Sequence, residues 1–182
     1  MSDFVVRTWI DGLFLLRRPT FSDDRGFFRE VFHSDELQNE LGFEFKPVQW
    51  NHSRSRSGVI RAIHAENWNK LVYPVTGKMF AAIVDIRPES KTFSKVLTFE
   101  FGDSDRYALF VSRGLANSIC VVGSEDVNYL YLVDAYYTGN DVRAVAWDDP
   151  DLNVKWPVAN PIISERDKKN PKLRDMFPDK FK

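Results

Sequence analysis

The chain has 182 residues, and its 25 lysines and arginines nearly balance its 26 aspartates and glutamates. This length suits one domain, residues 1–182, and is ample to bury a core. The net charge of −1 gives no general attraction for nucleic acid or membranes, so any anion site has to be local. No apolar run approaches the roughly 20 residues of a membrane-spanning helix, and the N-terminus lacks the layout of a signal peptide. We therefore expect a cytoplasmic protein.

The first elements are short. Residues 12–17, GLFLLR, predict a strand, and residues 21–26 form a polar turn with two acids before an arginine and a glycine. The next strand is expected over residues 27–32. Because strand side chains alternate, Glu30 lies there on the same face as two phenylalanines, Phe28 among them. We expect that face to point inward.

A helix is expected over residues 34–41, SDELQNEL. Ser34 is the N-cap candidate, acids occupy the first turn, and Gly42 follows the last turn. It is the only convincing helix in the first 150 residues. His33, just before it, is interpreted as a surface residue at the helix entry.

From Pro47 onward the sequence becomes dense in short strands separated by turn signals. This spacing, with almost no helix, is typical of a β-sandwich or barrel. From Asp148 the chain is rich in Pro, Asp and Lys, and we expect it to wrap the barrel before a short C-terminal helix or tail. The predicted strands cover residues 48–52, 59–64, 71–75, 79–87, 94–101, 108–111, 118–122, 129–133 and 142–147.

Cys120 is the only cysteine, so no disulfide can form within the chain. It sits in the apolar run SICVV, which favours a buried thiol over a catalytic one, because no base is evident beside it. Aromatic residues make up 14% of the chain, which suits an aromatic-lined interior or ligand site.

The three histidines are His33, His52 and His64. A metal-binding cupin needs two closely spaced histidines, a glutamate after them and a third histidine one motif later, because the metal requires three or four converging ligands. No His-x-His occurs here. We therefore expect no metal site.

His64 is the strongest candidate for a base. Arg61 precedes it by three residues, Glu66 follows by two and Lys70 by six. In a regular strand His64 would share a face with Ala62, and Arg61 would point to the opposite face. The residues alone leave two interpretations open, a hydrogen-bonded core histidine or a base.

Four tyrosines crowd the segment NYLYLVDAYY, residues 128–137. A tyrosine near a lysine can act as a general acid at neutral pH, because the cation favours the phenolate left behind. One of the four is a candidate for chemistry, while the others pack in the strand.

Asp167 ends the segment SERD. This segment is either a solvated turn or the source of a carboxylate that orients an imidazole by accepting from one ring nitrogen. The residues alone favour the turn.

Ordered motifs run along nearly the whole chain: FSDDRGFFRE at 21–30, QxNxS at 49–53, GVIRAIH at 58–64, KLV at 70–72, VDIRxxSxTF at 84–93, WxDP at 147–150, KWP at 155–157 and SxRD at 164–167. Together they resemble the dTDP-4-dehydrorhamnose 3,5-epimerases, a metal-independent branch of the cupins. The resemblance implies an all-β cupin-type jelly roll (double-stranded β-helix) with one or two short peripheral helices. It also implies a homodimer that exchanges or pairs N-terminal strands, and no cofactor.

The implied reaction inverts C3 and C5 of dTDP-4-dehydro-6-deoxy-D-glucose, giving dTDP-4-dehydro-L-rhamnose on the route to dTDP-L-rhamnose. The 4-keto group acidifies both flanking C–H bonds, so a base, an acid on the opposite face and a cation at the oxygen suffice. By resemblance, Asp167 holds the base His64, Lys70 stabilises the enolate and Tyr137 is the acid. The implied substrate contacts are Arg25 and Arg61 at the diphosphate, with Glu30, Gln49, Asn51, Asn117, Arg166 and Phe28, and Phe27 nearby.

The sequence departs from the family pattern at three points. Ala62 stands where a glycine is usual, Asn117 replaces a second active-site histidine, and Asp141 is only the nearest match to an acidic residue beyond the tyrosines. Two alternatives therefore stay open within the enzyme class, inversion at one centre only or a sugar on another nucleotide such as GDP or CDP. A third alternative is an inactive cupin that only binds a nucleotide sugar.

Overall fold

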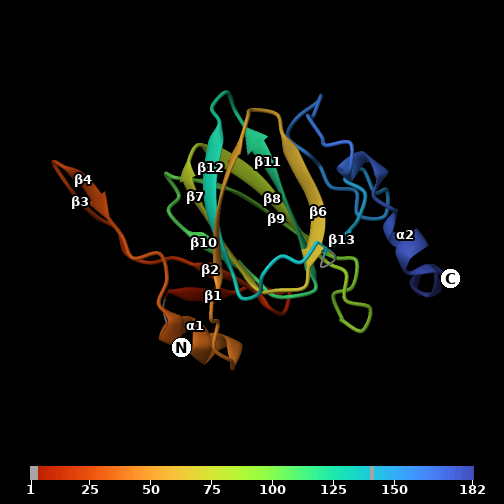
Figure 1. The fold of residues 1–182 in the computed structure, drawn as a ribbon, viewed down its shortest axis with the longest axis horizontal. Helices are drawn as coiled ribbons and strands as arrows, with labels where there is room; N and C mark the ends of the chain where they lie inside the picture. The colour runs from red at the N-terminus through yellow and green to blue at the C-terminus, as the bar shows by residue number, and fades with distance from the viewer. Residues whose placement is uncertain (1–3, 140–141) are drawn as a thin grey trace.

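The computed structural model describes residues 4–139 and 142–182, in which two antiparallel sheets face each other (Figure 1). The six-stranded sheet contains β1 (Val5–Arg7), β2 (Leu13–Leu16), β10 (Ala108–Val111), β7 (Lys70–Thr76), β12 (Val127–Val133) and β5 (Gln49–Ser55), in that order. The five-stranded sheet contains β13 (Val142–Ala144), β6 (Ile60–Glu66), β11 (Leu115–Val122), β8 (Lys78–Asp85) and β9 (Val96–Gly102). The predicted all-β jelly roll is confirmed.

Three apolar clusters hold these layers. One lies between the two sheets and includes Leu13, Met79 and Phe101. A second lies between the five-stranded sheet and the C-terminal segment, so this sheet is buried on both faces. Cys120 belongs to the second cluster and is fully buried, and burial raises the pKa of its thiol to about 11. The prediction of a buried thiol is thus confirmed.

The third cluster lies beneath α1 (Ser34–Leu41), on the outer face of the six-stranded sheet. The helix has the predicted bounds, and Gly42 ends it in the left-handed conformation at φ 77°, as a C-terminal glycine permits. His33, rather than Ser34, occupies the N-cap position, and it makes no side-chain capping bond. Among the described residues, none of the helices is long and apolar enough to cross a membrane.

A short hairpin, β3 (Phe21–Asp23) and β4 (Gly26–Phe28), projects from the barrel at the left of Figure 1. All six of its strand residues are exposed, and the side chain of Phe28 is among them with 65% of its surface accessible. The prediction of a strand over residues 27–32 with an inward face is therefore wrong. Two strands without a second layer have no inside to face, and β4 ends at Phe28.

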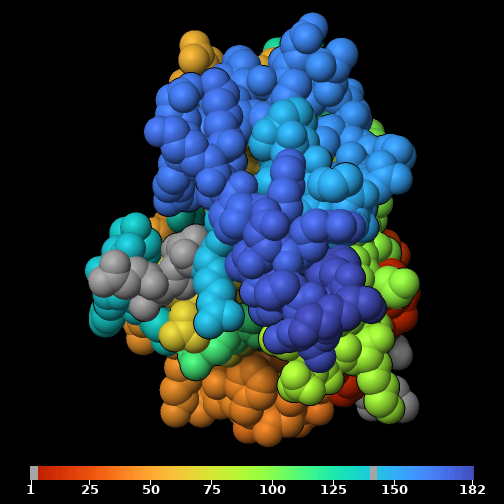
Figure 2. Space-filling model, turned by 90° about the vertical axis from the view of Figure 1, so that its right-hand side faces the viewer, coloured from red at the N-terminus to blue at the C-terminus, as the bar shows by residue number. Residues whose placement is uncertain are grey.

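The C-terminal segment packs on the outer face of the five-stranded sheet. Its atoms, blue in Figure 2, form much of the surface on that side of the molecule. Ile162 forms a parallel bridge with Val59, and its carbonyl accepts from the N–H of Ile60 at 3.0 Å. Farther along, the buried carboxylate of Asp149 accepts from the N–H groups of Leu152 and Leu173, at 3.1 and 2.6 Å. The segment ends in η1 (Asp167–Lys169), α2 (Leu173–Met176) and η2 (Pro178–Phe181).

Asp85 explains one of the sequence motifs in structural terms. Its side chain is fully buried at the end of β8 and accepts hydrogen bonds from Arg87, Ser90 and Thr92. Burial alone would raise the pKa of Asp85, but these hydrogen bonds outweigh it and lower the pKa to about 2. The motif at 84–93 thus fastens the loop that joins β8 to β9.

The lowered pKa of Asp85 predicts a pH dependence of stability. Since the folded-state pKa, about 2, lies below the ordinary 3.8, the ionised carboxylate stabilises the fold above that ordinary value, and this contribution is lost as pH falls toward 2. We expect the gap in unfolding free energy between the parent and Asp85→Asn to narrow by about 2 kcal/mol from about pH 5 to pH 2. Urea unfolding across that range measures it, and a gap that stays constant would contradict the assignment.

Candidate active site

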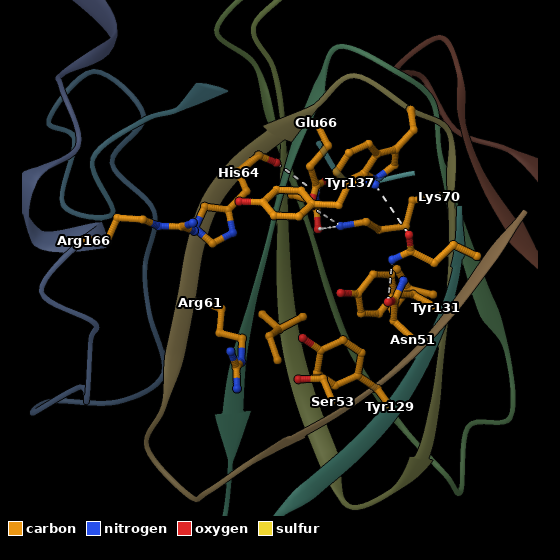
Figure 3. A pocket seen from close by; sticks show the side chains of 15 residues that line it. Asn51, Ser53, Arg61, His64, Glu66, Lys70, Tyr129, Tyr131, Tyr137 and Arg166 are labelled. Carbon is orange, nitrogen blue, oxygen red and sulfur yellow. Dashed lines mark hydrogen bonds and ion pairs between the residues drawn. The ribbon is translucent and has the colours of Figure 1, made fainter. Parts of the chain in front are cut away.

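A cavity of about 330 Å³ opens between the two sheets (Figure 3). Strands β5, β6, β7, β11 and β12 line it with alternate side chains, because every second residue of a strand faces the same side. The lining residues are Gln49, Asn51, Ser53, Arg61, His64, Glu66, Trp68, Lys70, Val72, Asn117, Ile119, Tyr129, Tyr131, Tyr137 and Arg166. The structure therefore gathers most of the predicted site residues in one place.

His64 and Asp167 form a hydrogen-bonded pair at one wall of the cavity. The distance between His64 Nε2 and Asp167 Oδ1 is 2.8 Å, and the exposed fractions of the side chains are 17% and 4%. Burial alone would raise the pKa of Asp167, but its hydrogen bond with His64 and the charges of His64 and Arg166 outweigh burial and lower the pKa. Asp167 is thus an anion that holds the imidazole, rather than part of a solvated turn.

This contact fixes the tautomer of His64. An ionised carboxylate only accepts, so the ring N–H lies on Nε2 and the lone pair lies on Nδ1. No acceptor or donor contacts Nδ1 among the described residues. Arg166 Nε donates to Asp167 Oδ1 at 3.4 Å. Its Nη2 lies 3.1 Å from His64 Nε2, but because a guanidinium only donates, this approach to the Nε2–H is a contact between two donors and no hydrogen bond. The free lone pair can take up a proton.

Lys70 brings an ammonium into the cavity from the start of β7. Its Nζ pairs with Glu66 Oε1, lies 3.3 Å from Asn117 Oδ1 and lies 4.9 Å from the centre of the Tyr131 ring. Only 7% of the Lys70 side chain is exposed. A nearly buried cation of this kind can stabilise negative charge on a ligand oxygen.

Tyr137 reaches the cavity from the segment after β12. Its ring packs edge-on against Trp68 at 6.3 Å, and its N–H donates to Gln49 Oε1 at 3.5 Å. Asp134 anchors the segment, because its carboxylate accepts from the N–H and the Nδ2 of Asn69 at 2.8 and 2.6 Å. Figure 3 shows the hydroxyl end of Tyr137 on the His64 side of the cavity.

The prediction that Arg61 and His64 point to opposite faces of β6 is wrong. Arg61 lines the cavity together with His64, although three residues separate the two positions. The pairing with β11 explains this: His64 is opposite Asn117 and Arg61 is opposite Ile119, so β6 contains one residue more than its partner. This bulge turns both side chains to one side. Ala62 instead is fully buried in the cluster beneath the C-terminal segment, and its methyl group does not narrow the cavity.

Three predicted contacts do not reach the cavity of their own chain. Arg25 and Phe28 lie on the projecting hairpin, where Arg25 pairs with Asp23 at 2.6 Å. Glu30 pairs with Arg18 at 2.9 Å and is half exposed. Asp141 lies outside the described residues.

Several lining residues were missed from sequence. Strand alternation would have predicted most of them, because residues two apart in a strand face the same side. Ser53, Glu66 and Val72 each lie two positions after a predicted site residue, namely Asn51, His64 and Lys70. Tyr129 and Tyr131 are likewise on one face of β12, with ring centres 6.0 Å apart. Among residues 4–139 and 142–182, no three His, Cys, Asp or Glu side chains gather as a group that could hold a metal ion.

Known proteins resemble this chain in sequence and in structure. A sequence profile described as dTDP-4-dehydrorhamnose 3,5-epimerase matches residues 7–175. A Shigella flexneri protein of that name is 33% identical over 175 residues, which cover 94% of this chain and 96% of the relative. The structure of RmlC from Legionella pneumophila, a dTDP-6-deoxy-D-glucose-3,5-epimerase in complex with dTDP-4-keto-L-rhamnose, has a TM-score of 0.88 at 28% identity and covers 96% of this chain and 95% of that one. The structure of ChmJ, a 3'-monoepimerase from Streptomyces bikiniensis in complex with dTDP-quinovose, has a TM-score of 0.89 at 26% identity. The match covers 95% of this chain and 90% of the ChmJ chain.

Proposed function

This chain belongs to the dTDP-4-dehydrorhamnose 3,5-epimerase family, and from that premise we propose that it inverts C3 and C5 of dTDP-4-dehydro-6-deoxy-D-glucose to give dTDP-4-dehydro-L-rhamnose. The observation that carries the proposal is the pair His64 and Asp167, 2.8 Å apart, in a cavity that also contains Lys70 and Tyr137. A base, a cation and an acid are the groups that inversion beside a ketone requires.

In the first step Nδ1 of His64 takes the proton from a carbon next to the ketone. The electron pair of the broken C–H bond forms a C=C bond, and the carbonyl π pair moves onto oxygen. The Lys70 ammonium stabilises this enolate oxygen by a charge-assisted hydrogen bond. Asp167 stabilises the imidazolium that forms, because it is an anion in contact with the other ring nitrogen.

In the second step Tyr137 donates its phenolic proton to the opposite face of the same carbon. The enolate electron pair forms the new C–H bond, the ketone is restored and the configuration is inverted. The phenolate then regains a proton from solvent, which reaches it because more than half of Tyr137 is exposed, and the His64 imidazolium releases its proton to solvent, so that base and acid are both restored. The second flanking carbon passes through the same two steps. Proton transfer of this kind contributes about 10²- to 10⁴-fold to the rate.

The nucleotide end of the substrate would lie toward Arg61 and Arg166. Both are exposed arginines that border the cavity, and guanidinium groups bind phosphate oxygens in a bidentate fashion. Gln49 and Asn51 would contact the sugar side, since their amides line the same cavity. The acid–base steps proposed for these residues use no cofactor.

Trapping the products tests the proposed function. After incubation with the protein, borohydride reduces the C4 ketone, and NMR then gives the configuration at C3 and C5. Inversion at both centres supports the proposal, and we expect the dTDP substrate to give a higher kcat/KM than its GDP and CDP counterparts. A protein that the substrate stabilises against heat while both centres stay unchanged would be a binding protein only.

Inversion at C3 alone is the second candidate function. It is supported by the similarity to the ChmJ structure and by Asn117, whose amide group is engaged by three neighbours instead of being free for the sugar. The same trapped products distinguish the candidates, because a single-centre enzyme leaves C5 in its original configuration.

A second copy of the chain is the partner we propose. The outer face of the six-stranded sheet has an apolar hollow of about 240 Å³, which α1 leaves uncovered. Its lining residues, which define the outer hollow, are Val31, Phe32, Trp50, Leu71, Tyr73, Leu130, Tyr131 and Leu132. The projecting hairpin of the same chain exposes Phe21 and Phe28, at 63% and 65%. Apolar surface on both partners favours a symmetric dimer in which each hairpin packs on the other subunit.

The dimer accounts for the position of Arg25, which would reach the partner's cavity. Mixing inactive His64→Ala chains with inactive Arg25→Ala chains then restores roughly a quarter of the parental activity, because half of the dimers are mixed and each has one intact site. Sedimentation of Trp50→Asp is expected to show a monomer, while Ile162→Asp, a change at an exposed residue of the C-terminal segment, stays dimeric. A parental chain that sediments as a monomer would refute the dimer.

A further inference from the structure

Glu66 places a carboxylate in the cavity, two residues after His64 on β6. Only 12% of its side chain is exposed, and both oxygens are engaged. Oε1 accepts from Lys70 Nζ, and Oε2 accepts from Asn117 Nδ2 at 2.7 Å. The proton-transfer steps proposed above do not use this carboxylate. Because it is nearly buried beside Lys70, its contribution to the reaction has to be a different one.

Asn117 closes the arrangement into a triangle. Its Oδ1 accepts from Lys70 Nζ at 3.3 Å, and its Nδ2 donates to the backbone carbonyl of His64 at 2.8 Å as well as to Glu66. Since an ammonium only donates, and a carboxylate and a carbonyl only accept, one orientation of the amide satisfies every contact. The triangle is therefore fixed to the backbone of the strand that carries His64.

The donors of Lys70 can be counted. An ammonium has three N–H groups. One is engaged by Glu66 and one by Asn117, and among the described residues no third acceptor contacts Nζ. The ring of Tyr131 lies 4.9 Å away and attracts the cation without taking a hydrogen bond. A single N–H remains for an oxygen of a ligand in the cavity.

We propose that Glu66 is a positioning residue, which with Asn117 fixes the Lys70 ammonium so that its one remaining N–H meets the oxygen that becomes the enolate. The inference rests on the proposed epimerase function. The carboxylate's own charge opposes an enolate, so its benefit is orientation rather than added attraction. Misplacing a catalytic group by about 1 Å costs as much as about 10²-fold in rate.

Glu66→Gln tests the positioning. The new amide keeps the shape but presents an N–H₂ group to the donors of either Lys70 or Asn117, so the triangle opens. We expect kcat to fall about 10- to 100-fold while KM changes less than about threefold, because the interaction is made as charge develops on the oxygen. The matched control is Glu100→Gln, which removes the carboxylate paired with Lys78 on the exposed surface of β8 and β9 and leaves kcat unchanged.

A double-mutant cycle with Lys70→Met separates positioning from other roles. If Glu66 acts through Lys70, then adding Glu66→Gln to Lys70→Met lowers kcat no further. An equal fall in both backgrounds, or parental kcat in Glu66→Gln, would overturn the inference. Thermal unfolding serves as the control that each variant is folded. A purely structural role of Glu66 would lower the melting temperature of Glu66→Gln without changing kcat. A parental protein without turnover would overturn the proposed function, and this inference with it.

Discussion

Replacing His64 with alanine is expected to lower kcat for inversion by about 10²- to 10⁴-fold. Nδ1 of the imidazole makes no hydrogen bond with any described residue, and Nε2 is held by Asp167 at 2.8 Å. Exchange of the sugar protons with solvent is lost too, because proton removal precedes every later step. Steady-state kinetics and NMR of the sugar measure both losses.

The matched control for this change is His52→Ala. His52 is exposed on β5, where its ring contacts Asn128 at 3.1 Å outside the cavity, so its loss leaves kcat unchanged. His64→Ala leaves the buried Asp167 with Arg166 as its remaining side-chain partner, so this change alters stability as well as chemistry. His64→Asn retains a donor for Asp167. If thermal unfolding shows that His64→Asn is as stable as the parent, then its loss of kcat is chemical. Inversion at the parental rate in either His64 variant would exclude His64 as the base.

Replacing Tyr137 with phenylalanine is expected to separate exchange from inversion. His64 still removes a proton and returns one from solvent to the same face, so deuterium enters the sugar from D₂O with retained configuration. Inversion requires a donor on the other face, and its rate falls about 10²- to 10⁴-fold. NMR after incubation in D₂O reads label and configuration together.

Tyr136→Phe is the control for this experiment. Tyr136 is the neighbouring tyrosine, is 67% exposed and does not line the cavity. We expect its variant to match the parent in both exchange and inversion. A Tyr137→Phe protein that inverts the sugar at the parental rate would contradict the assignment of the acid.

The fold was largely predictable because its strands are short, apolar and separated by turn residues. The predicted helix over 34–41 and the predicted strand over 108–111 match the structure residue for residue. The hairpin at 21–28 was not predictable as an exposed element, because its phenylalanines give the pattern of a buried strand. Sequence alternation shows which side chains share a face, but not whether a second layer covers that face.

The site was less predictable, for reasons that the contacts make plain. Asp167 meets His64 across 103 positions of sequence because the C-terminal segment docks on β6 through the bridge from Ile162 to Val59. No local pattern carries that contact. The bulge in β6 is equally nonlocal in origin, since it is defined by the pairing with β11, and it lies where Arg61 comes to the side of His64.

Incorporation of deuterium at C3 and C5 of dTDP-4-dehydro-6-deoxy-D-glucose in D₂O tests the central claim most directly, because it detects proton removal beside the ketone whatever the final equilibrium. We expect the parental protein to label both carbons, and the label at each to appear in the inverted configuration. Label at C3 alone would identify a single-centre epimerase. A folded protein that binds the nucleotide sugar and labels neither carbon would contradict the account.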